Sequence, residues 1–307
     1  MTLMHIIVLG GHGFIGSHFV KHAVRAGHRV TVADLRDAPR HAHGLNVDYH
    51  RASTSELASN VALLRTADVI VHCAYSTVPA TANAEPRRDI VENLIPLVEL
   101  LDAMDTANVQ RIVYLSSGGA VYGPPRTVPI VENHPLDPIS AYGVTKVAAE
   151  KYLGLHAASR GLQPTIIRPA NPYGIDQGKV GLLGAVTTFL NLLAAGRAAT
   201  IWGDGSVVRD FVHIDDVTRL LLTAVEQNKP GVYNCGSGTG CSLLDLLGTI
   251  ARVTRQHLSV NYEPARDFDP PAIVLDINAA RQSFSWKPQV DLEHGVRDVA
   301  QSLGLIS

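Results

Sequence analysis

The chain has 307 residues, of which 46% are hydrophobic, and its formal net charge is −2. A chain of this length can bury a sizeable core, and the near-neutral charge gives no indication of a nucleic-acid partner or an anionic membrane surface. No apolar run approaches the roughly 20 residues that a membrane-spanning helix needs.

The first half of the chain alternates short apolar runs with amphipathic stretches. The segment MTLMHIIVLGG has only a short apolar run and no basic leader, so it is interpreted as a first strand and not as a signal peptide. Strands are predicted over 5–10, 29–34, 67–74, 111–117 and 164–170, and helices over 14–27, 86–104 and 141–161. The strand segments are apolar nearly throughout, as strands buried on both faces are. This alternation predicts an α/β fold with a Rossmann-type doubly wound parallel sheet.

The pattern loosens after about residue 171. A helix is predicted over 181–196, followed by two short strands around a turn at Asp204 and Gly205. Asp215 or Asp216 is expected to cap the next helix. The second half is therefore expected to be a smaller C-terminal lobe whose segments partly return to the sheet.

The motif GGHGFIG predicts a dinucleotide site, because it follows a strand and opens a helix. Gly10, Gly13 and Gly16 permit a tight turn and let the backbone approach a pyrophosphate at the positive end of the helix. Asp34, at the end of the second strand, would accept hydrogen bonds from the adenosine ribose and repel a 2′-phosphate. NAD is therefore favoured over NADP, although Arg36 nearby tempers that choice. The alternative is that the glycines serve only strand–helix packing.

A second glycine cluster, CGSGTGC at 235–241, lacks this context and is interpreted as a turn before a helix capped by Ser242. Residues 1–170 are thus expected to form the NAD-binding Rossmann domain, and residues 171–307 mainly a substrate-binding lobe.

Tyr142 and Lys146, in YGVTK, form a candidate catalytic pair. They are one helical turn apart, so both side chains share one face of the predicted helix. The ammonium is expected to stabilise the phenolate and to lower the tyrosine pKa from about 10. A tyrosine so tuned can act as general acid and base near neutral pH.

No metal site is expected. Cys73, Cys235 and Cys241 have no CxxC spacing, which argues against zinc or a disulfide framework and fits a reducing cytoplasm. His72 and His213 lie in apolar strands, where a histidine is more often a satisfied core residue than a ligand.

The chain resembles the extended short-chain dehydrogenase/reductase family, and within it the NAD-dependent nucleotide-sugar epimerases of the UDP-glucose 4-epimerase type. The resemblance covers almost the whole chain. It rests on GGHGFIGSH, VIVHCA, SSGGAVYG, YGVTK, RPANPYG, IWGDGSVVRDFVHIDDV and RDFDPPAIVLD. It implies that Tyr142 takes the proton of the sugar 4-hydroxyl while hydride passes from C4 to NAD, that the 4-keto sugar turns over, and that hydride returns to its other face.

The resemblance also implies a set of contact residues. The expected cofactor contacts are Gly10, Gly13, Phe14, Ile15, Gly16, Asp34, Arg36, Ala74, Tyr142 and Lys146. The expected substrate contacts are Asn93, Asn171, Arg209 and Arg266. Alternatives are a turn-forming role for Asn171 and surface ion pairs for the two arginines. Trp202 is interpreted as packing, with a stacking platform for a base as the alternative.

In LSSGGAVYG the family's catalytic Ser or Thr falls on Gly118, and the acidic residues of the related dehydratases fall on Gly119 and Ala120. Dehydration and decarboxylation are therefore disfavoured, whereas epimerisation needs only the tyrosine, the lysine and NAD. Ser117 is the expected substitute for the missing hydroxyl, with a water beside Gly118 or a closer approach of Tyr142 to the sugar as alternatives. The two glycines are expected to make room for a bulkier sugar substituent, the alternative being that they only permit a tight turn.

The main prediction is thus a cytoplasmic NAD-dependent 4-epimerase of a UDP-hexose or modified UDP-hexose, serving surface polysaccharide synthesis. A nucleotide-sugar ketoreductase and a non-catalytic NAD-binding scaffold protein remain as alternatives. The resemblance also implies a homodimer formed through helices 86–104 and 141–161.

Overall fold

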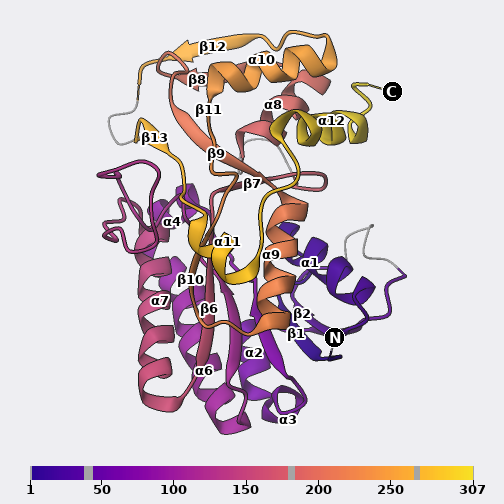
Figure 1. Cartoon of the computed structure of the whole chain (residues 1–307), viewed down its shortest axis with the longest axis vertical. Helices are drawn as coiled ribbons and strands as arrows, with labels where there is room; N and C mark the ends of the chain where they lie inside the picture. Colours follow the sequence, from indigo (N-terminus) through magenta and orange to yellow (C-terminus); the bar gives the residue numbers. More distant parts are fainter. Residues whose placement is uncertain (1, 38–43, 179–183, 266–269, 307) are drawn as a thin grey trace. The chain divides into compact units, whose positions relative to one another are not determined.

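The structure, a computed structural model, describes residues 2–37, 44–178, 184–265 and 270–306 (Figure 1). It divides into two compact units. Unit 1 comprises residues 1–121, 138–168 and 218–233, and unit 2 comprises residues 122–137, 169–217 and 234–307. Within the described ranges, no helix is long and apolar enough to cross a membrane.

A seven-stranded sheet organises unit 1, in the order β10-β6-β5-β4-β1-β2-β3. Its strands are β1 His5–Leu9, β2 Arg29–Asp34, β3 Asp48–Arg51, β4 Val69–His72, β5 Arg111–Leu115, β6 Gln163–Pro169 and β10 Gly231–Cys235. From β3 to β6 the neighbouring strands pair in parallel. The strand order reverses between β1 and β4, which is where open α/β sheets bind their ligands. The predicted Rossmann-type fold is confirmed.

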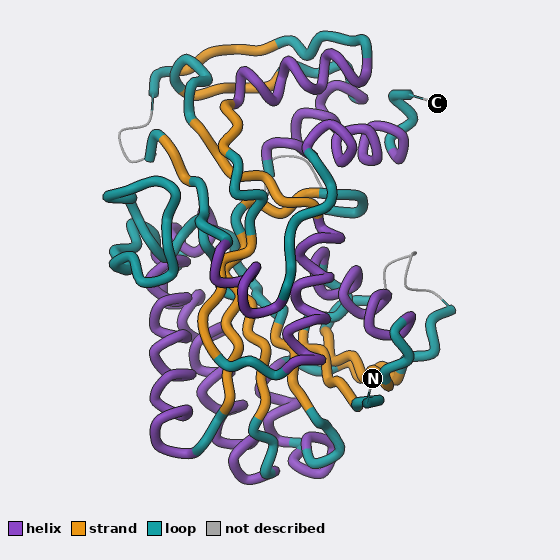
Figure 2. Tube along the Cα trace, viewed as in Figure 1, coloured by secondary structure: helices purple, strands orange, loops and turns teal. Residues whose placement is uncertain are grey.

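Helices cover the sheet on both faces, as Figure 2 shows. On one face lie α2 Thr54–Ser59, α3 Val61–Leu64, α6 Ile95–Ala107 and α7 Ala141–Arg160; on the other lie α1 Phe14–Arg25 and the part of α9 Ile214–Gln227 that belongs to unit 1. The first group shares a continuous apolar core with the strands. The apolar strand residues seen in the sequence are accounted for by burial under both helical layers.

The predicted helix over 86–104 is interrupted. It begins with α5 Pro86–Asp89, continues as the π-helix η2 Ile90–Leu94, and becomes regular in α6. Pro96 has no backbone N–H to donate to the preceding turn, which explains why the α-helical register changes just before it. Such π-helical turns often mark functional sites.

Two strands of the large sheet were missed, for different reasons. β3 reads DYHR, and all four residues are exposed at the sheet edge, so no apolar pattern marks it. β10 reads GVYNC, a run too short and too mixed in polarity to stand out in the irregular second half of the chain.

Unit 2 holds two small sheets with helices around them. β9 Val208–His213 pairs with β7 Asn171–Tyr173, β11 Gly240–Ser242 and β13 Ala272–Ile273, while β8 Ala199–Trp202 pairs with β12 Val260–Glu263. The helices are α8 Ala185–Ala194, α10 Leu243–Thr254, α11 Asn278–Phe284 and α12 Leu292–Ser302. β8 and β9 are the two short strands predicted around the turn at Asp204 and Gly205, and they belong to different sheets.

Two capping predictions have different outcomes. Ser242 caps α10 as expected, in a capping box with Asp245. Asp215 and Asp216 do not cap α9, because the helix already begins at Ile214 and both lie in its first turn. The buried Asp216 carboxylate instead accepts hydrogen bonds from the backbone of Gln289 and Val290 at 2.9 and 3.0 Å.

Candidate active site

The loop between β1 and α1 is shaped by its glycines. Gly10 has φ +74°, and an added Cβ at Gly16 would lie 2.1 Å from the Gly10 carbonyl oxygen, so only glycine fits there. No side chain caps the N-terminus of α1, whose first residues are Phe14 and Ile15. The backbone N–H groups of this turn are therefore available to an anion such as a pyrophosphate.

Asp34 ends β2 beside this loop, and the residue is 7% exposed. Its Oδ2 accepts a hydrogen bond from the His12 N–H and its Oδ1 accepts one from the Arg36 N–H, both at 2.9 Å. The Arg36 guanidinium lies against the same carboxylate, with Nε 3.3 Å from Oδ1. These contacts hold the Asp34 carboxylate at the edge of the cofactor cleft, and the Arg36 guanidinium balances part of its negative charge.

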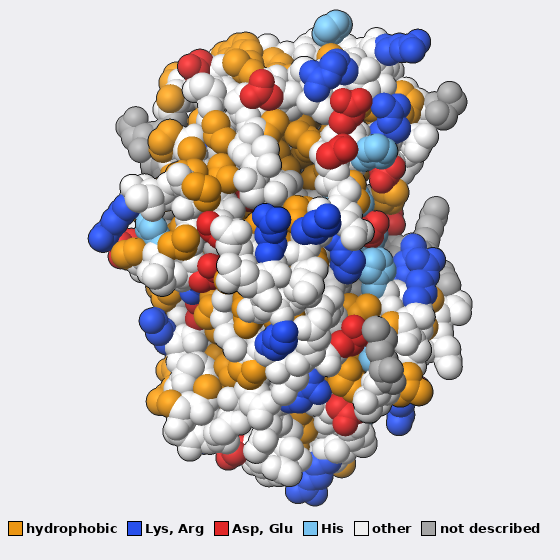
Figure 3. Space-filling view, in the orientation of Figure 1, with side chains coloured by type: hydrophobic (Ala, Val, Ile, Leu, Met, Phe, Trp, Pro, Cys, Tyr) orange, Lys and Arg blue, Asp and Glu red, His pale blue; other side chains and the backbone are white. Residues whose placement is uncertain are grey.

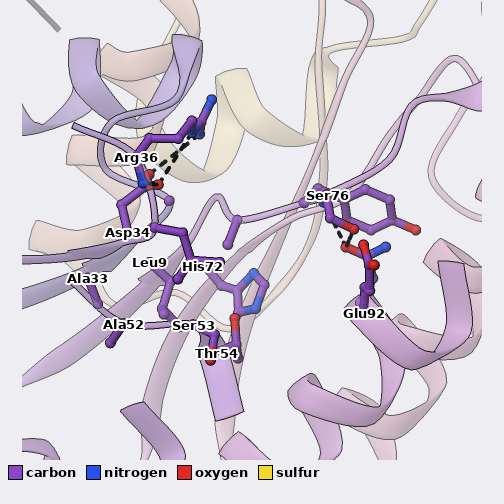
Figure 4. Close-up of a pocket in the computed structure, with 15 residues that line it drawn as sticks. Leu9, Ala33, Asp34, Arg36, Ala52, Ser53, Thr54, His72, Ser76 and Glu92 are labelled. Carbon is purple, nitrogen blue, oxygen red and sulfur yellow. Dashed lines mark hydrogen bonds and ion pairs between the residues drawn. The ribbon is translucent and has the colours of Figure 1, made fainter. Parts of the chain in front are cut away.

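A cleft of about 320 Å³ opens over the strand ends. Figure 4 shows Asp34 and Arg36 at one end, Ser76 and Glu92 at the other, and the His72 ring between them. Gly10, Ala74 and Asn93 line it as well, so the structure brings together residues predicted from four separate segments. Both ring nitrogens of His72 are buried without a hydrogen-bond partner among the described residues. The open amide turn, the fixed acid and these polar atoms fit a dinucleotide.

Replacing Asp34 with alanine is expected to raise the Kd for NAD by about 10- to 100-fold, because the ribose hydroxyls lose a charged acceptor. The Arg36 side chain would lose its partner and could face a 2′-phosphate, so the preference for NAD over NADP should narrow. Isothermal titration with both cofactors measures this. Asp48→Ala, at an exposed ion pair in β3, is the control; an unchanged Kd for Asp34→Ala would remove Asp34 from the cofactor site.

Tyr142 and Lys146 share one face of α7, as predicted. Ser140 caps this helix, with its Oγ accepting the Gly143 N–H at 3.1 Å. Lys146 is 3% exposed, and its Nζ donates to the Leu115 carbonyl oxygen at 2.7 Å, at the end of β5. Lys146 is thus buried at the carboxyl edge of the sheet, whereas Tyr142, one helical turn earlier, is partly exposed.

The pKa values of this pair differ from the expectation. Burial raises the pKa of Tyr142 to about 12, a hydrogen bond with Ser117 acts in the opposite direction, and the charge of Asp89 raises it further. The expectation that Lys146 lowers the Tyr142 pKa is wrong for the protein without bound ligands. The ammonium of Lys146 binds the Leu115 carbonyl oxygen and lies 5.8 Å from the Tyr142 ring centroid. Burial also lowers the pKa of Lys146, to about 7.

Behind the pair lies a buried ion pair. Arg168 on β6 contacts both oxygens of Glu150 on α7, with Nη2 2.5 Å from Oε2 and Nε 2.9 Å from Oε1. Ser116 donates to the same carboxylate at 2.5 Å. This network fixes α7 to the ends of β5 and β6, and with it the height of Tyr142 and Lys146 above the sheet.

The segment after β5 leaves open space. Gly118 is buried and Gly119 exposed, and nothing lies within 4 Å of a Cβ added at Gly119. The predicted substitute for the missing family hydroxyl, Ser117, is the side chain that hydrogen-bonds Tyr142.

The predicted substrate residues are distributed over both units. Asn93 lies in η2 of unit 1, where its side chain accepts the Ser76 N–H at 2.9 Å. In unit 2, Asn171 begins β7 and donates to the Asp210 carbonyl at 2.9 Å, so it lies in a strand and not in a turn. Arg209 lies on β9, with Nη1 2.8 Å from the Val208 carbonyl. Arg266 lies outside the described residues.

Trp202, interpreted as packing, lies at the end of β8 and is 42% exposed. That exposure disagrees with a role confined to packing and keeps the stacking alternative open. Among the described residues, no cluster of His, Cys, Asp or Glu could hold a metal ion.

Three residues near the pair were missed: Tyr75, Thr77 and Asp89. The Tyr75 ring packs edge-on against Tyr142 with centroids 4.9 Å apart, and the Lys146 Nζ lies 4.0 Å from the Tyr75 centroid. A signal existed in the sequence, since an aromatic residue directly follows VHCA at a strand end. Nothing local, however, pointed to an acid from the helix at 86–89.

Comparisons with known proteins agree with this geometry. The model of the NAD-dependent epimerase/dehydratase family matches residues 6–236. A putative UDP-glucose 4-epimerase of Methanocaldococcus jannaschii is 31% identical over 300 residues, covering 96% of each chain.

Solved structures agree as well. The UDP-glucose 4-epimerase of Thermotoga maritima, crystallised with UDP-glucose, superimposes with a TM-score of 0.90 at 32% identity, over 97% of this chain and 98% of the other. A UDP-N-acetylglucosamine 4-epimerase of Methanobrevibacter ruminantium M1, in complex with UDP-N-acetylmuramic acid, also gives 0.90, at 26% identity over 98% of each chain.

Proposed function

Because this chain belongs to the NAD-dependent epimerase/dehydratase family, we propose that it interconverts a UDP-hexose, or a modified UDP-hexose, and its C4 epimer. The chain is an epimerase enzyme with NAD as its cofactor. The observation that carries the specific proposal is that Tyr142 and the buried Lys146 share one face of α7 at the strand ends, in the same unit as the NAD cleft.

The reaction needs a group that removes and returns one proton at the sugar 4-oxygen. Bound NAD would supply the hydride acceptor and donor for C4. Tyr142 would take the hydroxyl proton and give it back after the keto sugar has turned over. Its high pKa in this chain means that a positive charge close to the phenolic oxygen is needed before the phenolate becomes accessible.

Lys146 would provide part of that charge and would also bind the nicotinamide ribose. Ser117 would hold the phenolic oxygen in place and contact the reacting sugar oxygen, since it already bonds Tyr142. These groups would act as acid, base and electrostatic support for the transfer of one proton.

The alternatives are less well supported. Dehydration would need acidic groups at the positions of Gly119 and Ala120, and neither side chain can supply them. A ketoreductase that releases oxidised cofactor each turnover usually prefers NADPH, which Asp34 disfavours. A scaffold protein would not require a buried lysine one helical turn from a tyrosine, because burying an ammonium group costs free energy.

We assign the nucleotide end of the substrate to unit 2. Arg209 and Arg266 would bind the diphosphate, because a guanidinium matches phosphate oxygens bidentately. Asn171 would donate to the same group, and the half-exposed Trp202 would stack on the base. Firm binding of this end would leave the hexose free to turn. The open space beside Gly119 suits an N-acetyl or carboxylate substituent.

The protein is proposed to act as a homodimer. Apolar side chains from η2, α6 and α7, which contact one another in unit 1, are between 44% and 57% exposed: Ile90, Val91, Ile95, Val144 and Leu155. Val144 and Leu155 are about three turns apart, so they lie on one face of α7. Figure 3 shows apolar, acidic and basic side chains mixed over the visible face.

Leu155→Glu is expected to convert the dimer into a monomer, raising the dimer Kd at least about 100-fold, since a charge would be buried at the interface. Size-exclusion chromatography with light scattering measures the mass. Leu244→Glu, at a leucine of α10 in unit 2 that is 46% exposed, should leave the dimer intact. A wild-type monomer, or a dimer that survives Leu155→Glu, would contradict this interface.

A proton NMR time course with catalytic NAD and a panel of UDP-hexoses tests the function. The panel includes UDP-glucose, UDP-N-acetylglucosamine, UDP-glucuronate and their galacto epimers. Interconversion of one pair without net cofactor reduction is expected and would name the sugar. NAD binding without turnover of any sugar would favour the scaffold protein. The proposed setting, cytoplasmic synthesis of surface polysaccharide, depends on which sugar is found.

A further inference from the structure

Asp89 is a buried carboxylate that the proposed reaction leaves unused. It ends α5 and is 0% exposed. Its Oδ1 accepts hydrogen bonds from the Thr77 hydroxyl and from the Asn93 Nδ2, the latter at 3.1 Å, and the Tyr75 hydroxyl lies 3.4 Å from its Oδ2. All of these donors are neutral, and no basic side chain in the described ranges forms an ion pair with it.

A buried carboxylate with only neutral donors costs free energy unless a cation is near. The side chain of Tyr75 lies next to Asp89 and also next to such a cation, the ammonium of Lys146. The hydroxyl end of Tyr75 faces Asp89, while the Lys146 Nζ lies 4.0 Å from the ring centroid and the Tyr142 ring packs against the same side chain. One aromatic ring thus lies between the buried acid and both catalytic groups.

The other groups around Lys146 do not provide a net negative charge. Burial raises the pKa of the Cys73 thiol to about 12 and lowers the pKa of His72 to about 3, so both are neutral near pH 7. Burial also raises the pKa values of Tyr75 and Tyr114, which are neutral as well. The Glu150 carboxylate also acts on Lys146, but Arg168 binds both of its oxygens.

We propose that Asp89 is the buried counter-ion of Lys146 and that, through Tyr75, it positions the Tyr142–Lys146 pair. Asp89 touches neither substrate nor cofactor in this role; it is a positioning residue. The proposal deepens the proposed function, because it rests on Tyr142 and Lys146 being the acid–base pair.

The sign of the effect follows from the charge. A negative group near Lys146 favours the ammonium, so removing it must lower the lysine pKa further. Asp89→Asn keeps the shape and one acceptor oxygen but removes the charge. We expect the Lys146 titration to move down by about one pH unit. The alkaline limb of kcat/KM against pH should move down by the same amount.

The titration can be followed by NMR of protein labelled with ¹³C at the lysine Cε, with Lys146 assigned by its loss in Lys146→Met. No sugar is needed, so the result is independent of whether the protein is an epimerase. Thr77→Val is the matched control, because it removes a hydrogen bond to Asp89 and keeps the charge. A Lys146 titration that is the same in Asp89→Asn as in wild type overturns the proposal.

A double-mutant cycle covers the case in which Asp89→Asn alone does not fold. If the two groups are counter-ions, Lys146→Met leaves the carboxylate unpaired, and Asp89→Asn in that background should raise the urea midpoint. The double variant is expected to be more stable than Lys146→Met. Additive losses of stability in the two variants would show that the charges are not coupled, and would overturn the proposal.

Discussion

Tyr142→Phe is expected to lower kcat by about 10³-fold, because the sugar 4-hydroxyl loses its acid and base. The fold should be unaffected, since the ring that packs against Tyr75 is kept and only the hydroxyl bonded to Ser117 is lost. The Kd for NAD should stay within about twofold, because the glycine loop and Asp34 are expected to make most of the cofactor contacts. Steady-state kinetics and isothermal titration measure the two quantities.

Tyr152→Phe is the matched control for this variant. Tyr152 lies on the same helix and is 38% exposed, so the loss of its hydroxyl should change neither kcat nor the Kd for NAD. A Tyr142→Phe enzyme that retained more than about a tenth of the wild-type kcat would assign the proton transfer to another group, with Ser117 or a water as the next candidates.

Gly16→Ala is expected to weaken NAD binding by at least about 100-fold. The new Cβ would lie 2.1 Å from the Gly10 carbonyl oxygen and 2.9 Å from the Gly11 Cα, both backbone atoms that cannot move aside without displacing α1 from β1. The amide turn that fits the pyrophosphate would be distorted. Overpacking of this kind typically costs about 1–3 kcal/mol of stability, so the melting temperature should fall as well.

Two further glycines calibrate this result. At Gly13 the added Cβ would meet the tip of the flexible Arg36 side chain at 2.8 Å, so Gly13→Ala should weaken binding less than Gly16→Ala. At Gly119 it would meet nothing within 4 Å, so Gly119→Ala should bind NAD like wild type. Equal affinities of all three variants would show that the turn does not carry the cofactor.

The fold could be predicted from the sequence to the extent that burial leaves a pattern. The strands around β1 and β4 are apolar because helices cover both of their faces, and the sequence shows it directly. β3 left no such trace, because its edge position exposes every side chain. The π-helical turn in 90–94 was missed because Pro96 interrupts a helix whose apolar spacing continues across it.

The candidate site divides along a similar line. Motifs that carry their own spacing, such as the glycine loop and the Tyr142–Lys146 pair, could be located without a structure. The role of Asp89 could not be predicted, because it depends on the Tyr75 side chain, which lies next to both Asp89 and Lys146 only in the folded chain. The pKa of Tyr142 was predicted in the wrong direction for the same reason: spacing gives the shared helical face but not the orientation of the ammonium.

The most direct test of the central proposal follows the hydrogen at C4. The UDP-hexose that the panel identifies is prepared with deuterium at C4 and incubated with the protein and catalytic NAD in ordinary water. The account predicts that the epimer retains the deuterium at C4 and that no reduced cofactor accumulates, because the same hydrogen leaves and returns within one site. Deuterium lost to the solvent, or reduced cofactor released in step with turnover, would contradict it.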